Sequence, residues 1–332
     1  MKRLLIPLLA LLLSPPTVQA MEFKIATLAP DGSSWMNAMR SGAEEIEQRT
    51  EGRVSFRFYP GGIMGNDRSV LRRIRVGQLH GGAITGGGLS EILPESQVYS
   101  LPFLFQDYDE VDYVRQHMDP VLLDALKDKG FISFGISEGG FAYLMANAPV
   151  SSAGDLSGKK VWIPEGDDIS RSAFEASGVS PIPLPLTDVL TGLQTGLVDT
   201  IAGSPTGAIA LQWHTRVSHL TETPLMYLYG TMVVQRRAFE RLSTGDQAIV
   251  QEVMGETFRQ LDRRMRADNQ QALAALQQQG ITFVQPNSDE FGEWSRRVDG
   301  ATERLLSRGL FERTVLEQLR QHQQTYRQQQ LE

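Results

Sequence analysis

Two stretches of sequence decide the fold: DLSGKKVWIP, residues 155–164, and PLPLTDVLTGLQTGLVDTIAGS, residues 183–204. The first predicts a turn and then a short strand over residues 160–163, which Pro164 ends. The second predicts an amphipathic helix that ends at Gly196, followed by a strand over residues 198–202. A strand, a helix and a second strand in this order are typical of an α/β domain.

The first twenty residues predict a secretory signal peptide. Lys2 and Arg3 precede an apolar run over residues 4–13, and Val18 and Ala20 form the small-residue pattern of a cleavage site. The apolar run is shorter than the ~20 residues that a membrane-spanning helix needs, which argues against an anchor. We therefore expect residues 1–20 to be removed and the remainder to be exported.

Composition narrows the class of protein. The 332-residue chain carries a net charge of −7, which becomes −9 when Lys2 and Arg3 leave with the signal peptide. An acidic chain without a long basic run is a poor partner for nucleic acid or an anionic membrane. The absence of cysteine excludes a disulfide scaffold and a lipid-anchored lipoprotein. The length exceeds what a single hydrophobic core usually serves, so we expect two domains.

The rest of the chain alternates between strand and helix patterns, which predicts a mostly parallel, doubly wound sheet. The expected strands cover residues 23–27, 54–59, 82–85, 131–136, 141–146, 225–234 and 281–284. The expected helices cover residues 35–50, 67–76, 109–118, 120–129, 289–306 and 312–329.

One further helix is expected to be unusually long. No proline interrupts the chain between Ser243 and Gly280, and apolar residues such as Met254, Phe258 and Leu261 recur at helical spacing. About 35 residues at 1.5 Å each give roughly 50 Å, which is longer than one domain is wide. Because this helix has an apolar stripe, we expect it to contact both domains.

Four segments, residues 59–84, 101–111, 155–164 and 186–199, together resemble the DctP-like solute-binding proteins of TRAP transporters. The resemblance implies a two-lobed α/β fold like that of periplasmic binding proteins, with a ligand cleft between the lobes and a long bridging helix. It implies a periplasmic receptor that captures a small organic solute and delivers it to TRAP membrane permease subunits. Some branches of this family are thought to work with a TPR-type partner, which the resemblance allows.

We assign the lobes from where the chain is expected to cross between them. Lobe I should contain residues 21–140 and 229–265, and lobe II residues 141–228 and 266–332. In such a fold, ligands sit outside the carboxyl ends of the strands. The expected ligand-binding residues at these ends are Ser34, Trp35, Thr85, Gly86, Gly87, Phe141, Tyr143, Trp162, Pro164, Ser204, Thr206 and Tyr229.

Trp162 occupies the position where the family usually has an arginine that binds a carboxylate. An indole cannot form the bidentate pair that a guanidinium makes with a carboxylate. We therefore expect a ligand that is more apolar or neutral than a C4-dicarboxylate, in contact with Trp162. In the alternative, Trp162 is a core residue and Arg171, Arg216 or backbone N–H groups hold an organic acid.

Two other classes of function remain open in the sequence. GISEG, residues 135–139, matches the nucleophile motif of a serine hydrolase, with Ser137 as nucleophile and His214, His219 or His322 as base. A purely structural protein is the third possibility. The histidines lack metal-ligand spacing, and a metal site at Asp167 and Asp168 is a weak alternative to a helix start. We expect no enzyme activity, cofactor or metal ion.

Overall fold

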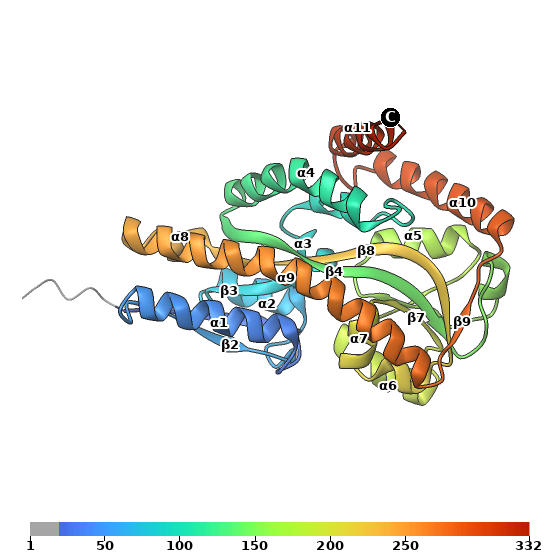
Figure 1. The fold of residues 1–332 in the computed structure, drawn as a ribbon, viewed down its shortest axis with the longest axis horizontal. Helices are drawn as coiled ribbons and strands as arrows, with labels where there is room; N and C mark the ends of the chain where they lie inside the picture. Colours follow the sequence, from blue (N-terminus) through green and yellow to red (C-terminus); the bar gives the residue numbers. More distant parts are fainter. Residues whose placement is uncertain (1–19, 332) are drawn as a thin grey trace, which may run out of the picture.

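The computed structural model describes residues 20–331, so the predicted signal peptide lies outside the described residues apart from Ala20. Within the described range, no helix is both long and apolar enough to cross a bilayer. Figure 1 shows the elements in two groups. The long strands β4 (Phe131–Ala146) and β8 (His219–Gln235) and the long helix α9 (Thr244–Gln278) run through both.

One group is built on three parallel strands. β1 (Met21–Thr27) pairs with β2 (Val54–Tyr59) and with β3 (Gly81–Thr85). Helices α1 (Ser34–Arg49) and α2 (Asp67–Arg75) connect them, and the side chain of Ser33 caps α1 by accepting a hydrogen bond from the Met36 N–H. These elements begin and end within a few residues of the ranges predicted from the sequence.

Two strands far longer than predicted join the groups. β4 (Phe131–Ala146) and β8 (His219–Gln235) pair antiparallel along most of their length. β8 also pairs antiparallel with β3 at one end and parallel with β9 (Thr282–Val284) at the other. The sheet order is β2-β1-β3-β8-β4-β7, where β7 (Thr200–Gly203) is antiparallel to β4. The prediction of a mostly parallel sheet is therefore wrong. β4 carries the chain from the first group of elements to the second and β8 carries it back, so these two strands run in opposite directions and pair antiparallel.

Residues 131–136 and 141–146 form one continuous strand, although the sequence predicted two. Register shifts on either side of Gly139 and Gly140 bend β4 where it passes between the groups. Gly140 has a φ of +86°, and a Cβ there would lie 2.3 Å from the Asn269 amide nitrogen on α9. Glycine therefore allows strand and helix to approach each other at this crossing.

The predicted long helix is confirmed as α9 (Thr244–Gln278), which is capped by Ser243. Its first half packs on α1, where a Cβ on Gly42 would lie 2.7 Å from Thr257 Oγ1. Its second half packs on α7 (Pro205–Ala210), where Asn269 accepts a hydrogen bond from Thr206. The helix therefore contacts both groups of elements, as Figure 1 shows.

The second group contains a separate two-stranded parallel sheet, β5 (Trp162–Pro164) and β6 (Ile182–Leu184). Helices α5 (Asp168–Ala176) and α6 (Val189–Thr195) flank it, and Gly196 ends α6 in the left-handed conformation, with a φ of 71°. The remaining elements are α3 (Gly86–Leu89), α4 (Tyr108–Asp128), α8 (Arg236–Phe239), α10 (Ser288–Ser307), α11 (Arg313–Gln329) and the 3₁₀ turns Pro94–Ser100, Ala153–Leu156, Leu186–Asp188 and Trp213–Arg216.

The prediction of separate helices before and after Pro120 is wrong, because α4 continues through this proline. The proline removes one backbone donor, but Met118 and Leu122 are buried in the same hydrophobic core. This shared packing keeps both segments in one helix. The lobe boundaries given above remain a prediction.

Candidate functional site

A cavity of about 470 Å³ lies between the two groups of elements. The residues at the carboxyl ends of β1, β3 and β5 line it, and β4 and β8 form its floor. Most of its wall is apolar. The apolar lining side chains include Leu28, Pro30, Trp35, Ile84, Trp162, Ile163, Pro164, Phe174, Leu186, Trp213, Met226, Leu228 and Met265. Such a cavity has the size and character of a small-molecule site.

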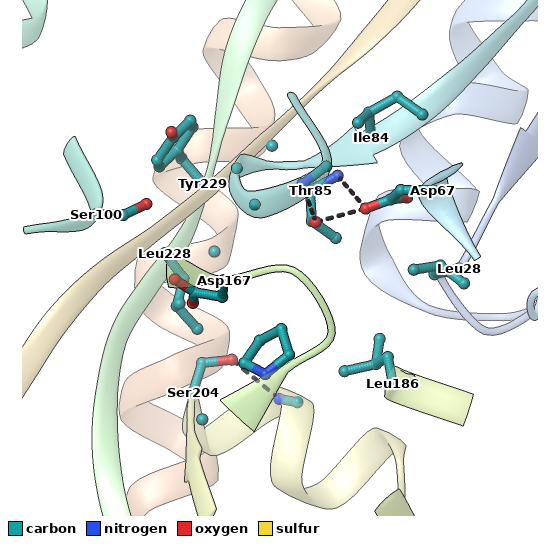
Figure 2. A pocket seen from close by; sticks show the side chains of 18 of the residues that line it. Leu28, Asp67, Ile84, Thr85, Ser100, Asp167, Leu186, Ser204, Leu228 and Tyr229 are labelled. Atoms are coloured by element: carbon teal, nitrogen blue, oxygen red, sulfur yellow. Dashed lines mark hydrogen bonds between the residues drawn. The ribbon is translucent and has the colours of Figure 1, made fainter. Parts of the chain in front are cut away.

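Thr85 organises the wall at the end of β3. Its Oγ1 caps α3 by accepting a hydrogen bond from the Gly88 N–H at 3.2 Å and donates to Asp67 Oδ2 at 2.5 Å. The Thr85 N–H also donates to Asp67 Oδ2, at 3.2 Å. Figure 2 shows this pair of hydrogen bonds at the edge of the pocket, near Leu28 and Ile84.

Burial perturbs Asp67. It raises the pKa of this carboxyl from 3.8 to about 6, against the opposing effect of the two hydrogen bonds from Thr85. The second oxygen, Oδ1, is shielded from solvent and has no hydrogen-bond partner among residues 20–331.

Two helix caps form part of the opposite wall. Asp167 caps α5 by accepting hydrogen bonds from Ser170 N–H at 2.9 Å and from Ser170 Oγ at 2.6 Å. Burial raises the pKa of Asp167, which these two hydrogen bonds partly offset. Ser204 caps α7 by accepting from the Gly207 N–H at 3.2 Å. Figure 2 shows Asp167 and Ser204 across the pocket from Asp67.

Trp162 lies in the cavity wall and is also packed against neighbours. Its indole meets that of Trp213 edge to face, with ring centroids 5.2 Å apart, and only 4% of Trp162 is exposed. Its Nε1–H donates to the Leu184 carbonyl at 3.0 Å. Because that donor is occupied, Trp162 presents apolar ring surface to the cavity.

An ion-pair network lies beneath the floor. Arg266 on α9 pairs with Asp112 on α4 at 2.5 Å and with Glu138 on β4 at 2.8 Å. The Arg266 guanidinium also lies 4.6 Å from the ring centroid of Tyr108. The Glu138 side chain is fully buried, and its Oε2 also accepts a hydrogen bond from the Tyr227 hydroxyl. The network thus connects α4, β4, β8 and α9 where the chain crosses between the groups.

Carboxylates outnumber cations in the wall. The acidic lining residues are Asp67, Glu91, Glu138, Glu165 and Asp167. Arg68 is the one basic residue among the described lining residues, and its Nε donates to Glu91 at 2.7 Å. Arg171 and Arg216, the alternative anion ligands, lie outside the wall. Arg171 is 3.8 Å from Asp168 and Arg216 is exposed.

The structure brings together eight of the twelve residues expected at the site. Those lining the cavity are Trp35, Thr85, Gly86, Gly87, Trp162, Pro164, Ser204 and Tyr229. Tyr229 is held there by a hydrogen bond from its hydroxyl to the Ser96 carbonyl at 2.6 Å.

Four expected residues lie outside the cavity wall. The register shift between Glu138 and Gly140 breaks the alternation of β4, and beyond it Phe141 and Tyr143 pack into the hydrophobic core, with the Phe141 ring centroid 4.7 Å from that of Tyr108. The Ser34 hydroxyl donates to Asp268, and the Thr206 hydroxyl donates to Asn269. These two hydroxyls hold α9 against α1 and α7.

Sequence reasoning missed three lining residues with clear physical roles: Asp67, Glu138 and Trp213. Asp67 was recognised only as a helix start. Acidic residues are common in the first turn of a helix because the helix dipole stabilises their charge there. Only the contact with Thr85 in the folded protein therefore marks Asp67 as part of the cavity wall. Trp213 had no distinguishing sequence context.

The hydrolase interpretation fails on geometry. Ser137 lies inside β4 rather than on a turn between a strand and a helix, and its hydroxyl donates to the Gly230 carbonyl at 3.2 Å. The three candidate bases make other contacts: His214 with Ala208, His219 with Ser218, and His322 with His117. Over the described part of the chain, no group of three or more His, Cys, Asp or Glu side chains is placed to bind a metal ion.

Solved structures share this fold. The sugar acid binding protein DctPAm from Advenella mimigardefordensis strain DPN7T, in complex with galactonate, superposes with a TM-score of 0.86 at 20% identity, covering 92% of this chain and 99% of that one. A TRAP periplasmic solute binding protein from Desulfovibrio salexigens with bound orotic acid gives 0.83 at 19% identity, with coverage of 92% and 99%. The expected two-lobed α/β fold with a cleft and a bridging helix is thereby confirmed.

Comparison of the amino-acid sequence points to the same group of proteins. The C4-dicarboxylate-binding periplasmic protein DctP of Rhodobacter capsulatus is 24% identical over 287 residues, which are 85% of each chain. A model of the DctP family, the bacterial extracellular solute-binding proteins of family 7, matches residues 25–308. The chain belongs to this family of solute-binding receptors.

Proposed function

We propose that this protein captures a small organic solute in the cavity and delivers it to the membrane subunits of a TRAP-type permease. The observation that carries the proposal is the position of the cavity, between two groups of elements joined by β4, β8 and α9. Three connections of this kind allow a hinge motion. Contacts with both walls exist only when the cleft is closed, so the solute shifts the population toward the closed state.

The proposed solute is less anionic than a C4-dicarboxylate. Trp162 offers ring surface where a carboxylate-binding arginine is expected, and Arg68 is already paired with Glu91. Trp35, Trp162 and Tyr229 are the proposed ligand-contacting aromatic residues. Thr85 and Ser204 are the proposed hydroxyl contacts. The relatives named above are described with C4-dicarboxylate, galactonate and orotic acid, so an organic acid is the competing ligand class.

The proposal places the protein in the periplasm after removal of residues 1–20, with lobe I and lobe II as assigned from the sequence. It involves no covalent chemistry and no cofactor. A TPR-type partner is compatible with it.

The test of this proposal measures both solute binding and the change in the shape of the protein. A broad library of metabolites is screened by thermal unfolding, and solutes that raise the midpoint are examined by small-angle scattering. A true ligand should raise the midpoint and reduce the radius of gyration together, whereas a nonspecific stabiliser changes only the first. If no solute in a library that includes acids, alcohols and amines closes the cleft, the receptor proposal fails.

A further inference from the structure

The cavity surface that a solute can reach is largely apolar. The half-buried apolar residues of the wall, each of which keeps some uncovered surface, include Leu28, Pro30, Trp35, Leu186, Leu228 and Met265. They belong to the loop after β1, the 3₁₀ turn Leu186–Asp188, β8 and α9, so both groups of elements and the segments that join them contribute. A solute that covers these side chains removes apolar surface from water, which favours binding.

The carboxylates deeper in the wall are already engaged within the protein. Asp67 Oδ2 accepts two hydrogen bonds from Thr85, and its Oδ1 is shielded from solvent. Both oxygens of Asp167 accept hydrogen bonds from Ser170. The Glu138 side chain is fully buried in its ion pair. A cation beside these groups would give up its hydration for little gain, and burying a charge without a partner is costly.

The other charged residues of the described wall lie where water reaches them. Arg68 pairs with Glu91 at 2.7 Å, and 59% of the Arg68 side chain and 30% of the Glu91 side chain are exposed. Glu165 is exposed and accepts a hydrogen bond from Asn66. Water screens such groups, so each attracts a charged solute only weakly. The wall therefore favours an uncharged solute over an ion of either sign.

Leu28 and Leu186 lie on segments of different groups that approach each other at one edge of the cavity. A Cβ on Gly62 would lie 3.3 Å from Leu28 Cδ2 and 3.0 Å from Thr187 Cγ2, so the loop at Gly62 contacts both groups there. Figure 2 shows Leu28 and Leu186 on the same side of the pocket. Closure of the cleft would bring these two leucines against one solute, and opening would part them.

We propose that the cavity takes an uncharged solute with an apolar body, and that Leu28 and Leu186 determine this specificity by covering the body from the two walls. Closure around such a solute buries apolar surface of both leucines. Closure around an ion leaves a charge without a partner in a poorly solvated space. This inference rests on the proposed receptor function and specifies the solute class of the same site.

The experiment uses two matched sets of probes. One set is 3-phenylpropanol, 3-phenylpropanoate and 3-phenylpropylamine, and the other is hexanol, hexanoate and hexylamine. Binding to the full chain is measured by calorimetry at neutral pH, where the acid and the amine of each set are ionised. We expect the alcohol to bind at least about tenfold more tightly than either ion of its set, because only the alcohol avoids desolvating a charge.

Leu28→Ala and Leu186→Ala test the two leucines. Each should lower the affinity for the alcohols at least about fivefold, because the shorter side chain covers less of the apolar body. Leu190→Ala is the control. Leu190 is half-buried and packs against the same hydrophobic cluster as Leu186, but it lies outside the cavity wall, so its loss should leave the affinities unchanged.

Three results would overturn the inference: an ion binding as tightly as the alcohol of its set, no binding of either alcohol, or unchanged alcohol affinity in both cavity variants. The order of the probes on the unmodified protein decides the solute class even if a variant fails to fold. Closure around an acid or an amine would leave the receptor function standing and remove only this inference. Absence of closure with every solute of the wider library would remove the receptor function itself.

Discussion

The Asn66 side chain donates a hydrogen bond from Nδ2 to Glu165 Oε2 at 3.2 Å and so connects the two walls of the cavity. The same amide caps α2 with its Oδ1, which accepts from the Ser69 N–H. One side chain therefore serves a local element and a contact across the cleft. Aspartate at this position would keep the cap, because Asp and Asn are equally good N-caps, but it would lose the donor.

Asn66→Asp should weaken solute binding without unfolding the protein. The new carboxylate would face Glu165, and repulsion between exposed charges of about 1 kcal/mol corresponds to a loss of roughly fivefold in affinity. The free energy of unfolding without ligand should stay within about 0.5 kcal/mol of the original. Calorimetric titration and denaturant unfolding measure the two quantities.

The same substitution at Asn37 provides the control for that prediction. Asn37 is exposed on α1 and its Nδ2 donates to the Gly32 carbonyl, away from the cavity. Asn37→Asp should leave the affinity unchanged. Equal losses in both variants would show that the contact between Asn66 and Glu165 does not assist closure.

Trp162→Phe should weaken binding and also lower stability. Phenylalanine keeps an aromatic ring but loses the donor to the Leu184 carbonyl and part of the packing on Trp213. We expect about 1–3 kcal/mol of lost stability, from the unpaired carbonyl and the reduced contact. Trp294→Phe is the control, because Trp294 is equally buried but lies on α10 outside the cavity wall. A Trp162→Phe variant that binds every ligand with undiminished affinity would exclude the indole as a contact.

Arg266→Ala should be the most destabilising of these substitutions. Among residues 20–331, it leaves the fully covered Glu138 carboxylate with the Tyr227 hydroxyl as its remaining hydrogen-bond partner. Removing one partner of a buried ion pair costs about 3–5 kcal/mol. Arg264→Ala, two residues earlier on the same helix, removes an exposed arginine 4.0 Å from Asp268 and should change stability by less than about 1 kcal/mol. Similar midpoints in urea for both variants would contradict the role assigned to the network.

Asp67 should make the unliganded protein less stable as the pH rises. Its pKa is about 6 when folded, above the ordinary value of 3.8, so between these values the folded state holds the proton more tightly than the unfolded state. Stability from this group is therefore present at low pH and lost as pH rises toward 6. Asparagine cannot ionise, so Asp67→Asn should gain about 1–3 kcal/mol over the original protein above pH ~6.

The gain should disappear below pH ~4, where Asp67 is protonated in both states. Denaturant unfolding of both proteins across this range measures the difference, and Asp168→Asn should show no such pH-dependent gain. A constant difference at all pH values would indicate that Asn changes packing around Thr85 and Gly88 rather than relieving a buried charge.

The sequence by itself determined most local elements and the class of the protein. Ser243, Gly196 and the apolar stripe of α9 specify helix ends and a long bridging helix through contacts a few residues apart. Such local signals can be recognised in the sequence without knowledge of the fold. The four segments that resemble TRAP receptors indicated the family because their order along the chain is itself a property of the sequence.

Only the tertiary structure decided which side chains reach the cavity. Whether 131–146 is one strand or two depends on pairing with β8, which lies about eighty residues later in the chain. The face on which Phe141 lies follows from that pairing, and it turns the ring away from the cavity. Asp67 looked like an ordinary helix start. Thr85 binds one of its carboxylate oxygens and Gly88 leaves room for that oxygen, and contacts of this kind are a property of distant segments brought together rather than of any local pattern.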